Sequence, residues 1–357
     1  MQKKITYRIG DVSKIYSGGD RPEIYSDIQN SECSIPIYSN GLDNEGLYGY
    51  TNKSQIEGDC ITVAARGVNI GTVFYRPTPF LPIVRLLSVI PNRTLVNAKY
   101  LYYYFQIDTI IGTGSAQPQL TIPFFQKKKI LIHEDISYQQ KIASILSAYD
   151  NLIQNYKKQI EALQTASSEL YKEWFVRFRF PGWKNAKFEN GIPEGWKVEK
   201  LGTLAHISTG KCNREDAEDD GIYPLFDRSQ EIKKSNEWIK DCEAIIVPGE
   251  GTSFIPRYYK GKFNLHQRCY CVEPKYPDFG KFLFYVLMLN RKYFLSVATG
   301  ATVPSLRYNN FASMKFILPE ISLCNNFNKI ANDIFAKVDN LQQQITNLTQ
   351  QRDLLLP

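Results

Sequence analysis

Two long stretches of the chain place apolar residues at alternating spacings of three and four positions, a pattern typical of an amphipathic α-helix. In residues 134–178 this stripe continues without a proline for about 33 residues, and at about 1.5 Å of rise per residue it predicts a helix about 50 Å long. Residues 320–357 repeat the pattern and predict a second long helix. The first helix is expected to begin at Ser137, because Ser137 and Gln140 have the spacing of a capping box.

Residues 1–133 and 179–319 follow a different pattern. Short segments of alternating apolar and polar residues are separated by Gly, Pro and Asn, as in IPIYSNGLDNEGLYGYT from Ile35. Such alternation predicts β-strands joined by turns. Each region then continues with an aromatic-rich segment, a turn and a last strand, KKKILI or MKFILP, before its long helix. The pattern predicts two mixed α+β domains with a mostly β framework.

The two regions are copies of one unit. The phrase TGSAQPQL at residues 113–120 returns 186 residues later as TGATVPSL, with four of its eight positions identical. Other matches follow in the same order, among them residues 35–38 with 223–226, KYLYYYF from Lys99 with KFLFYVL from Lys281, and Gly67 with Gly249. Because the order never changes and the offset varies by only a few residues, we infer a duplication of a unit of about 180 residues.

The duplication predicts four segments: a first domain (1–133), a central helix (134–178), a second domain (179–319) and a C-terminal helix (320–357). Two long helices of similar pattern pair most simply with each other, and tandem copies related by a pseudo-twofold axis make that pairing antiparallel, as in a coiled coil. The alternative is that each helix covers only its own domain. The residues expected to pair the helices or to bind a partner are Ile145, Tyr149, Leu152, Tyr156, Leu163, Trp174, Phe175, Ile334, Val338, Leu341, Ile345 and Leu348.

Positive charge is concentrated in the two domains. Residues 1–133 hold 14 basic and 10 acidic side chains, and residues 177–319 hold 22 and 16, whereas both helical segments are slightly acidic. Two basic domains suit a polyanionic partner such as nucleic acid, although a mild excess of lysine and arginine also serves solubility.

Cysteine usage and hydropathy predict a cytoplasmic protein. Seven cysteines without a secretory leader indicate reduced thiols, and no run approaches the 18 apolar residues that a membrane span needs. The cluster His266-Gln-Arg-Cys269-Tyr-Cys271 offers ligands for a metal, but it lacks a CxxC pair. Alternation along a strand explains the cluster better, so we expect no metal site.

Three segments carry a resemblance to a known family. The helical run QQKIASILSAYDNLIQNYKKQIEAL from Gln139, the segment SSELYKEWFVRFRFPGW from Ser167, and GIPEGWKVEKLGTLA from Gly191 closely resemble the specificity subunits of type I restriction-modification systems. The TG phrase and its copy resemble the recurring turn of that family's target-recognition domains. The sequence departs from the family in having no proline before the first helix and no second YKEWF after the last one.

The resemblance implies two target-recognition domains that each read half of a bipartite, asymmetric site in double-stranded DNA, with the helices setting the spacing. It also implies two methyltransferase subunits that methylate adenine with S-adenosylmethionine, and two restriction subunits that cleave DNA with ATP and Mg. All of this chemistry would lie in the partners, so we expect a non-catalytic chain without a cofactor.

The residues agree with a non-catalytic role. The sequence contains neither a GxxxxGK[ST] phosphate-binding loop nor the Asn/Asp-Pro-Pro-aromatic tetrapeptide of amino-methyltransferases. The segment VPGEGTSF from Val247 is the nearest imitation of a glycine-rich nucleotide loop, but its counterpart ARGVNIGTVF from Ala65 indicates a repeated structural turn. Three histidines at positions that do not match between the copies give acid–base catalysis little support.

Base reading needs arginine for guanine, Asn or Gln for adenine, or other donor–acceptor side chains on loops that reach the major groove. The candidates are Ser39, Asn40, Arg66, Asn69, Gln117 and Gln119 in the first domain, and Asp227, Arg228, Ser229, Arg257, Arg268, Ser305 and Arg307 in the second. Each has a structural alternative, since Asn40-Gly41 and Gln117-Pro118 are also typical turn sequences. The tyrosines of KYLYYYF are expected to pack in the core instead of stacking on bases.

Two further functions stay open from the residues alone. One is a specificity subunit of a related methyltransferase–nuclease system. The other, from a different class, is a scaffold whose domains bind protein or glycan. Steeply salt-dependent binding to duplex DNA would separate a DNA reader from such a scaffold.

Overall fold

The computed structural model describes residues 3–112, 118–276 and 279–357. They form two compact units, of which unit 1 comprises residues 1–156 with 343–357, and unit 2 comprises residues 157–342. Each unit therefore contains one β-rich domain together with a part of both long helices. This division groups residues that contact one another, whereas the four-segment division made from the sequence stays a prediction.

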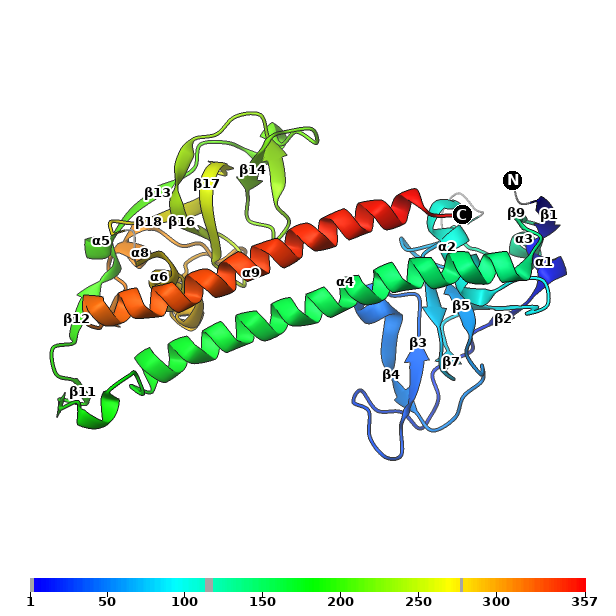
Figure 1. Cartoon of the computed structure of the whole chain (residues 1–357), viewed down its shortest axis with the longest axis horizontal. Coiled ribbons are helices and arrows are strands. Elements are labelled where there is room, and N and C mark those ends of the chain that lie inside the picture. The colour runs from blue at the N-terminus through cyan, green and yellow to red at the C-terminus, as the bar shows by residue number, and fades with distance from the viewer. Residues whose placement is uncertain (1–2, 113–117, 277–278) are drawn as a thin grey trace. The chain divides into compact units, whose positions relative to one another are not determined.

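The domain of unit 1 contains three antiparallel or mixed sheets among its described residues (Figure 1). Strand β1 (Lys4–Arg8) pairs antiparallel with β9 (Lys129–His133) where the domain meets the first long helix. The larger sheet has the order β2 (Ser13–Ser17), β8 (Leu87–Pro91), β5 (Cys60–Val63) and β6 (Val73–Arg76). A third sheet has the order β4 (Leu47–Thr51), β3 (Ile35–Tyr38) and β7 (Leu81–Pro82). The short helices are α1 (Ile9–Val12), α2 (Ala98–Ile107) and α3 (Ile122–Gln126).

The domain of unit 2 has one continuous sheet with the order β13 (Ala205–Thr209), β18 (Cys269–Pro274), β16 (Lys240–Pro248), β17 (Arg257–Leu265), β14 (Tyr223–Phe226) and β15 (Lys233–Ser235). Strand β12 (Lys197–Lys200) pairs antiparallel with β19 (Lys315–Leu318), and β10 (Phe188–Glu189) pairs with β11 (Ile192–Pro193). Its short helices are α5 (Leu201–Leu204), α6 (Gly280–Leu289), α7 (Arg291–Val297) and α8 (Tyr308–Ala312) (Figure 1).

The topology confirms the duplication and the α+β fold with two pseudo-symmetric domains. The order β2-β8-β5-β6 of unit 1 matches β13-β18-β16-β17 of unit 2, and in each unit a strand pairs parallel beyond it, β3 with β7 and β14 with β17. The units differ because β17 runs without a break, whereas Pro77 and Pro79 lie between β6 and β7. Proline has no N–H for a sheet ladder, so the corresponding strand of unit 1 is divided.

The aromatic-rich segments form helices and pack in the core, as predicted. Tyr100 and Tyr103 of α2 are buried, and so are Phe282 and Tyr285 of α6. Helix α2 begins at a cap where the Asn97 side chain accepts a hydrogen bond from the Tyr100 backbone N–H. The tyrosine run of the first domain is therefore framework, and its rings are not a platform for bases.

Both long helices are present, and the cap of the first lies two residues before the expected Ser137. Helix α4 spans Ile136–Tyr171 and continues as a π-helical turn, Lys172–Val176, while α9 spans Ile321–Leu354. The Asp135 carboxylate accepts hydrogen bonds from the Ser137 backbone N–H and hydroxyl, both at 2.8 Å. Asp135 is thus the capping residue, because it lies outside the first helical turn where a side-chain acceptor can reach the unpaired N–H groups.

The two helices meet in each unit with opposite direction. In unit 2 the Tyr171 ring at the end of α4 lies 5.7 Å from the Phe327 ring near the start of α9. In unit 1 the Arg352 guanidinium near the end of α9 lies 2.7 Å from the Asp150 carboxylate of α4. These contacts pair the end of one helix with the beginning of the other, which is the antiparallel arrangement.

The residues expected to pair the helices fall into three groups, which are buried, partly exposed and exposed. Trp174 and Phe175 are buried in unit 2, where their rings pack against Phe327 of α9, so packing is their role. Val338 and Leu341 are buried as well, and Tyr149, Tyr156, Leu163, Ile334, Ile345 and Leu348 are partly exposed. Ile145 and Leu152 are 54% and 37% exposed, which contradicts a place in a helix seam. The neighbouring Leu146 and Ile153 are the buried residues of that part of α4.

Candidate nucleic-acid interface

In unit 1 the predicted residues converge on the loops that follow β3 and β5. The Asn40 side chain accepts a hydrogen bond from the Ala65 backbone N–H at 2.8 Å and donates one to the Val84 carbonyl at 2.7 Å. The Asn69 side chain donates to the Asn40 carbonyl at 3.1 Å, and the Ser39 backbone N–H donates to the Gly46 carbonyl. Asn40 therefore holds three loops together, which favours the structural alternative for this residue.

Arg66 and Gln119 form the polar centre of this loop cluster. They face each other in an isolated β-bridge, and an Arg66 guanidinium nitrogen lies 3.5 Å from the Gln119 amide oxygen. The Leu120 backbone N–H donates to the Ala65 carbonyl at 2.9 Å and so fixes the end of the TG phrase to the β5 loop. Gln117 lies outside the described residues.

In unit 2, three of the seven predicted residues hold the β14 loop. The Asp227 carboxylate accepts hydrogen bonds from the Ser229 backbone N–H and hydroxyl, and lies 3.2 Å from the Lys233 ammonium group. Burial alone would raise the pKa of Asp227, but these partners together lower it, so the carboxylate stays charged. The Arg257 guanidinium donates to the Ser229 and Asp227 carbonyls at 2.8 and 2.6 Å, over the Phe226 ring. Asp227 and Arg257 are therefore loop supports.

Arg228 and Arg268 converge on a carboxylate that the sequence did not single out. The Glu250 carboxylate lies 2.7 Å from an Arg228 nitrogen and 2.8 Å from an Arg268 nitrogen. The Glu250 side chain is 14% exposed, whereas the two arginine side chains are 46% and 52% exposed. The two guanidinium groups thus reach the surface from a shared and nearly buried anchor.

Ser305 and Arg307 complete a polar hollow beside Glu250. Its volume is about 220 Å³. It is lined by Gly249, Glu250, Gln267, Arg268, Tyr270, Ser305, Leu306 and Arg307. The Leu306 backbone N–H donates to the Gly249 carbonyl at 2.7 Å, and Glu250 faces Ser305 in a β-bridge. The second TG phrase is therefore fixed to the loop after β16 in the same way as the first is fixed to the loop after β5.

This shared pairing corrects one match between the copies. The carbonyls that accept from the two leucines belong to Ala65 and Gly249, so Gly249 corresponds to Ala65. The counterpart of Gly67 is Gly251, and both have a positive φ, +77° and +121°. The sequence alignment had joined Gly67 to Gly249, two residues out of register, because a shared glycine outweighed the spacing. VPGEGTSF is the repeated turn that was expected, between β16 and β17.

His266 precedes Gln267 of this hollow and accepts a hydrogen bond that supports the neighbouring loop. Burial, followed by the charge of Arg228, lowers the pKa of His266, so its ring is neutral near pH 7. Its Nδ1 atom lies 3.0 Å from the Arg268 backbone nitrogen and accepts that N–H. Gln267 donates to Asn213 at 2.6 Å on the neighbouring loop. The sequence pattern gave no signal for Glu250, Gln267 or Asn213, because single polar residues in turns are common.

The cysteine cluster forms a different group from the one that the sequence suggested. Among the described residues, Cys242, Cys271 and Glu273 bring ligand atoms within 4.8 Å of one another, without His266 or Cys269. The Lys240 ammonium group lies 3.3 Å from the Glu273 carboxylate and already neutralises it. The expectation of no metal site therefore stays a prediction. The described helices include none with an apolar stretch long enough to cross a bilayer.

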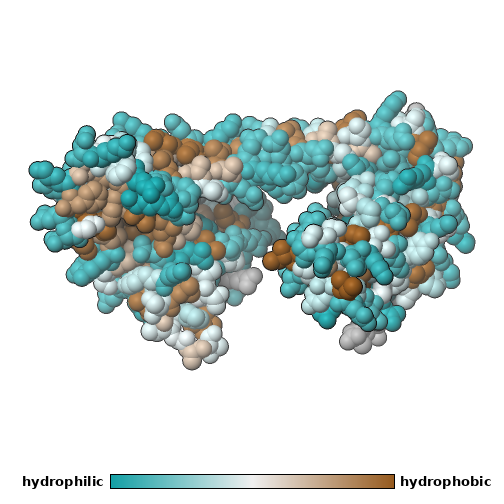
Figure 2. Space-filling model, turned by 90° about the horizontal axis from the view of Figure 1, so that it is seen from below, coloured by the Kyte–Doolittle hydropathy of each residue, from teal (hydrophilic) through white to brown (hydrophobic). Residues whose placement is uncertain are grey.

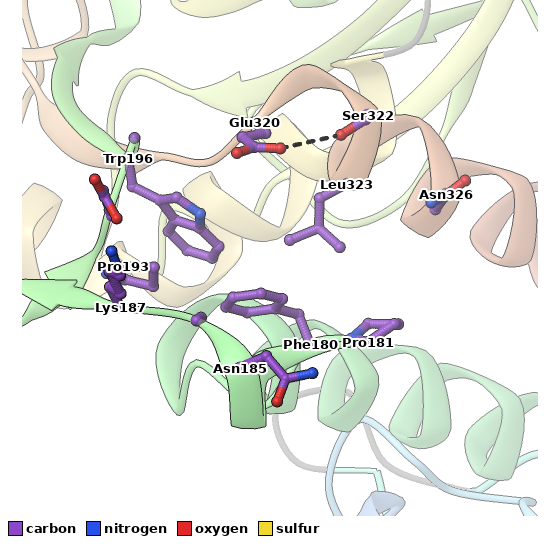
Figure 3. A pocket seen from close by; sticks show the side chains of 13 residues that line it. Phe180, Pro181, Asn185, Lys187, Pro193, Trp196, Glu320, Ser322, Leu323 and Asn326 are labelled. Atoms are coloured by element: carbon purple, nitrogen blue, oxygen red, sulfur yellow. Dashed lines mark hydrogen bonds between the residues drawn. The ribbon is translucent and has the colours of Figure 1, made fainter.

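A larger hollow lies in unit 2 where the chain passes from α4 to β12 and where α9 begins. Its volume is about 550 Å³. Figure 3 shows Phe180, Trp196 and Leu323 at its wall, with the Ser322 hydroxyl hydrogen-bonded to Glu320 at 3.4 Å. The Phe180 and Trp196 rings lie 5.2 Å apart. On the face shown in Figure 2, hydrophilic residues predominate and apolar residues form separate groups among them.

Comparison with known proteins finds one family. The family described as the type I restriction modification DNA specificity domain matches residues 1–165 and 193–353. The type I restriction enzyme MjaIX specificity subunit of Methanocaldococcus jannaschii is 27% identical over 338 residues, covering 81% of this chain and 74% of the relative. The EcoDI specificity subunit of Escherichia coli is 31% identical over 159 residues, covering 44% of this chain and 35% of the relative.

A solved structure has the same fold. The crystal structure of the S subunit of a type I restriction-modification system from M. genitalium superimposes with a TM-score of 0.70 at 17% identity. The alignment covers 99% of this chain and 95% of that one.

Proposed function

The chain belongs to the type I restriction-modification DNA specificity family, and from this premise we propose that each of its two domains reads one half of a bipartite, asymmetric DNA site. The observation that carries the proposal is the loop cluster in each domain. The same backbone pairing between a TG phrase and a glycine turn recurs in both, but it presents Arg66 and Gln119 in one and Glu250 and Ser305 in the other. A constant framework with different polar side chains is what a reader of two unlike half-sites needs.

The chain itself supplies recognition and no chemistry. Methylation of adenine with S-adenosylmethionine belongs to two methyltransferase subunits, and ATP- and Mg-dependent cleavage to two restriction subunits, so that the chain is required for both reactions. The complex acts in the cytoplasm, where the DNA lies. Basic side chains of both domains contact phosphates and supply most of the affinity.

Two surfaces suit the methyltransferase subunits. Ile145 and Leu152 are exposed seven residues apart on α4, a spacing that repeats every two helical turns and fits the apolar face of another helix. The hollow walled by Phe180, Trp196 and Leu323 offers aromatic surface of the kind that anchors partner side chains. One surface lies in each unit, as two copies of a partner require.

The function is tested by expressing the chain with its methyltransferase subunits and mapping methylated adenines across the genome. The expected result is one bipartite motif with unlike halves, which disappears when this chain is omitted. Binding of the purified complex to duplex DNA should weaken by at least about tenfold between about 50 and 200 mM salt, because phosphate contacts release counterions. Methylation that is independent of this chain, or binding that salt leaves unchanged, would contradict the proposal and favour a scaffold.

A further inference from the structure

We propose that the Arg228–Glu250–Arg268 cluster is the guanine-reading centre of the second domain, in which Arg228 and Arg268 contact the base and Glu250 is the positioning residue. The proposal rests on the proposed function and specifies what one of its two sites recognises. It is built on the ion pairs at 2.7 and 2.8 Å that join both guanidinium groups to one carboxylate.

The cluster lies at a position that both domains use to present a side chain. Arg66 and Glu250 correspond, because each follows the residue whose carbonyl accepts from the leucine of the TG phrase and each precedes a glycine of positive φ. Each also forms a β-bridge to the residue before that leucine, Gln119 or Ser305. The backbone at this position is therefore the same, and the domains differ in the charge that it carries.

The geometry leaves the arginines able to bind a base. A guanidinium group has five N–H donors. Arg228 and Arg268 each use one terminal nitrogen to pair with Glu250, so the other N–H groups remain for a base. Guanine offers two acceptors, O6 and N7, on its major-groove edge, and a bidentate arginine is the most common contact to it. The nearly buried Glu250 carboxylate limits the rotation of two long side chains, which lowers the entropy lost when they bind.

The size and charge of the hollow agree with contact to a base edge. Its volume of about 220 Å³ is below the range of about 300–1,000 Å³ typical of pockets that enclose a ligand, so it does not suit a base flipped out of the duplex. Two exposed arginines on one carboxylate leave an excess of positive charge, and Arg307 adds to it at the rim. Excess positive charge favours an acceptor-rich base edge near the phosphates.

The first domain presents another chemistry at the same place. Arg66 faces the Gln119 amide there, with no carboxylate among the contacts that the described residues show for it. We expect the two half-sites to differ at the base pair nearest this position. Substitution of Arg66 therefore changes one half of the motif, and substitution in the Glu250 cluster changes the other.

The test uses the complete complex with its methyltransferase subunits and reads the methylated motif from cells. Arg268→Lys keeps the positive charge but loses the bidentate fork, so it relaxes discrimination at one guanine by about 5- to 150-fold, the equivalent of about 1–3 kcal/mol. Glu250→Gln relaxes the same position because it frees both arginines. Glu273→Gln is the matched control: it removes a carboxylate paired with Lys240 at the opposite end of β18, and the motif should stay unchanged.

Each outcome decides one of the two proposals. A wild-type complex without a bipartite motif overturns the proposed function itself. A wild-type bipartite motif with no guanine in the half that Arg66→Lys leaves intact overturns the guanine assignment. So does an unchanged motif in Arg268→Lys, or an equal loss at all sites, which would indicate a phosphate contact or a structural role. If Glu250→Gln fails to fold, Arg268→Lys decides alone, because that side chain is half exposed.

Discussion

At the scale of single residues, the two domains share glycines at places where no side chain fits. Gly18 and Gly210 are matched between the copies, directly after β2 and β13. A Cβ atom on Gly18 would lie 2.7 Å from the Ile83 nitrogen, and one on Gly210 would lie 1.7 Å from the Leu265 carbonyl oxygen. Both contacts are with backbone atoms, which cannot turn away as a flexible side chain does.

We therefore expect Gly18→Ala and Gly210→Ala to destabilise their own unit by about 1–3 kcal/mol, the usual cost of forcing an extra methyl group into a packed site. Gly210→Ala should be the more severe change, because its contact is shorter. Urea unfolding of each variant measures the free energy of unfolding. Gly19→Ala is the control, since a Cβ there meets no atom within 4 Å. An equal loss in Gly19→Ala would contradict the expectation, because Ala restricts the unfolded chain and should stabilise a site where space is free.

Residue chemistry also explains which site residues the sequence could and could not indicate. Arg228 and Arg268 are candidates from the sequence because arginine on a loop is a general signal for DNA contact. Glu250 was missed, because a carboxylate in a turn carries no signal until its two arginine partners are known. Asn40 was taken as a reader, since nothing local shows that its amide is occupied by Ala65 and by the distant Val84.

At the scale of elements, the start of α4 depends on one exposed carboxylate. The hydrogen bonds from Ser137 hold the pKa of Asp135 below its ordinary value. A carboxyl group whose pKa is lower in the folded state stabilises it above its ordinary pKa, and this contribution is lost as the pH falls through the folded value. The effect of Asp135 should therefore be complete near pH 7 and vanish in strong acid.

Asp135→Ala should lower the midpoint of thermal unfolding by a few degrees near neutral pH, since it leaves N–H groups of the first turn unpaired. The difference from the wild type should narrow as the pH falls below about 3.9, the ordinary value for aspartate. Thermal unfolding followed by circular dichroism across this range measures both effects. Ser137→Ala is the comparison: it should cost less than Asp135→Ala, and the reverse order would restore Ser137 as the cap.

The helices and the duplication could be predicted because both signals can be recognised in the sequence without knowledge of the fold. Spacings of three and four specify a helix wherever it lies, and an ordered series of matches specifies a repeat whatever it folds into. The apolar stripe on α4 is broader than the buried face, so the sequence could not separate Leu146 and Ile153 from the exposed Ile145 and Leu152. The order of strands in the sheets could not be predicted either, because a pairing such as that of β14 with β17 joins segments far apart in the chain.

At the scale of the whole molecule, α4 begins in unit 1 and ends in unit 2, and α9 runs from unit 2 to unit 1. If these helices set the distance between the half-sites, lengthening them must lengthen the tolerated gap. Seven residues in each helix add about 10.5 Å, which corresponds to about three base pairs at about 3.4 Å each.

Insertion of one heptad into α4 together with one into α9 should therefore move the methylated motif to a spacer about three base pairs longer, with both halves unchanged. An insertion in α4 alone should reduce methylation, because it puts the two apolar stripes out of register. Mapping of methylated adenines again provides the measurement. If the paired insertion retains the original spacer, the helices do not determine the gap.

Unit 2 consists of one uninterrupted stretch of chain, residues 157–342, whereas unit 1 is closed by both remaining pieces. If each domain reads one half-site, genetic exchange between related genes needs just two crossovers, one within each helix, to replace one of the two readers. Each crossover falls within a long helix with a repeating apolar pattern. The hybrid helix therefore keeps its apolar stripe even where the two genes differ in sequence. Under the proposed function, the product of such an exchange recognises a new target that keeps one half of the old one.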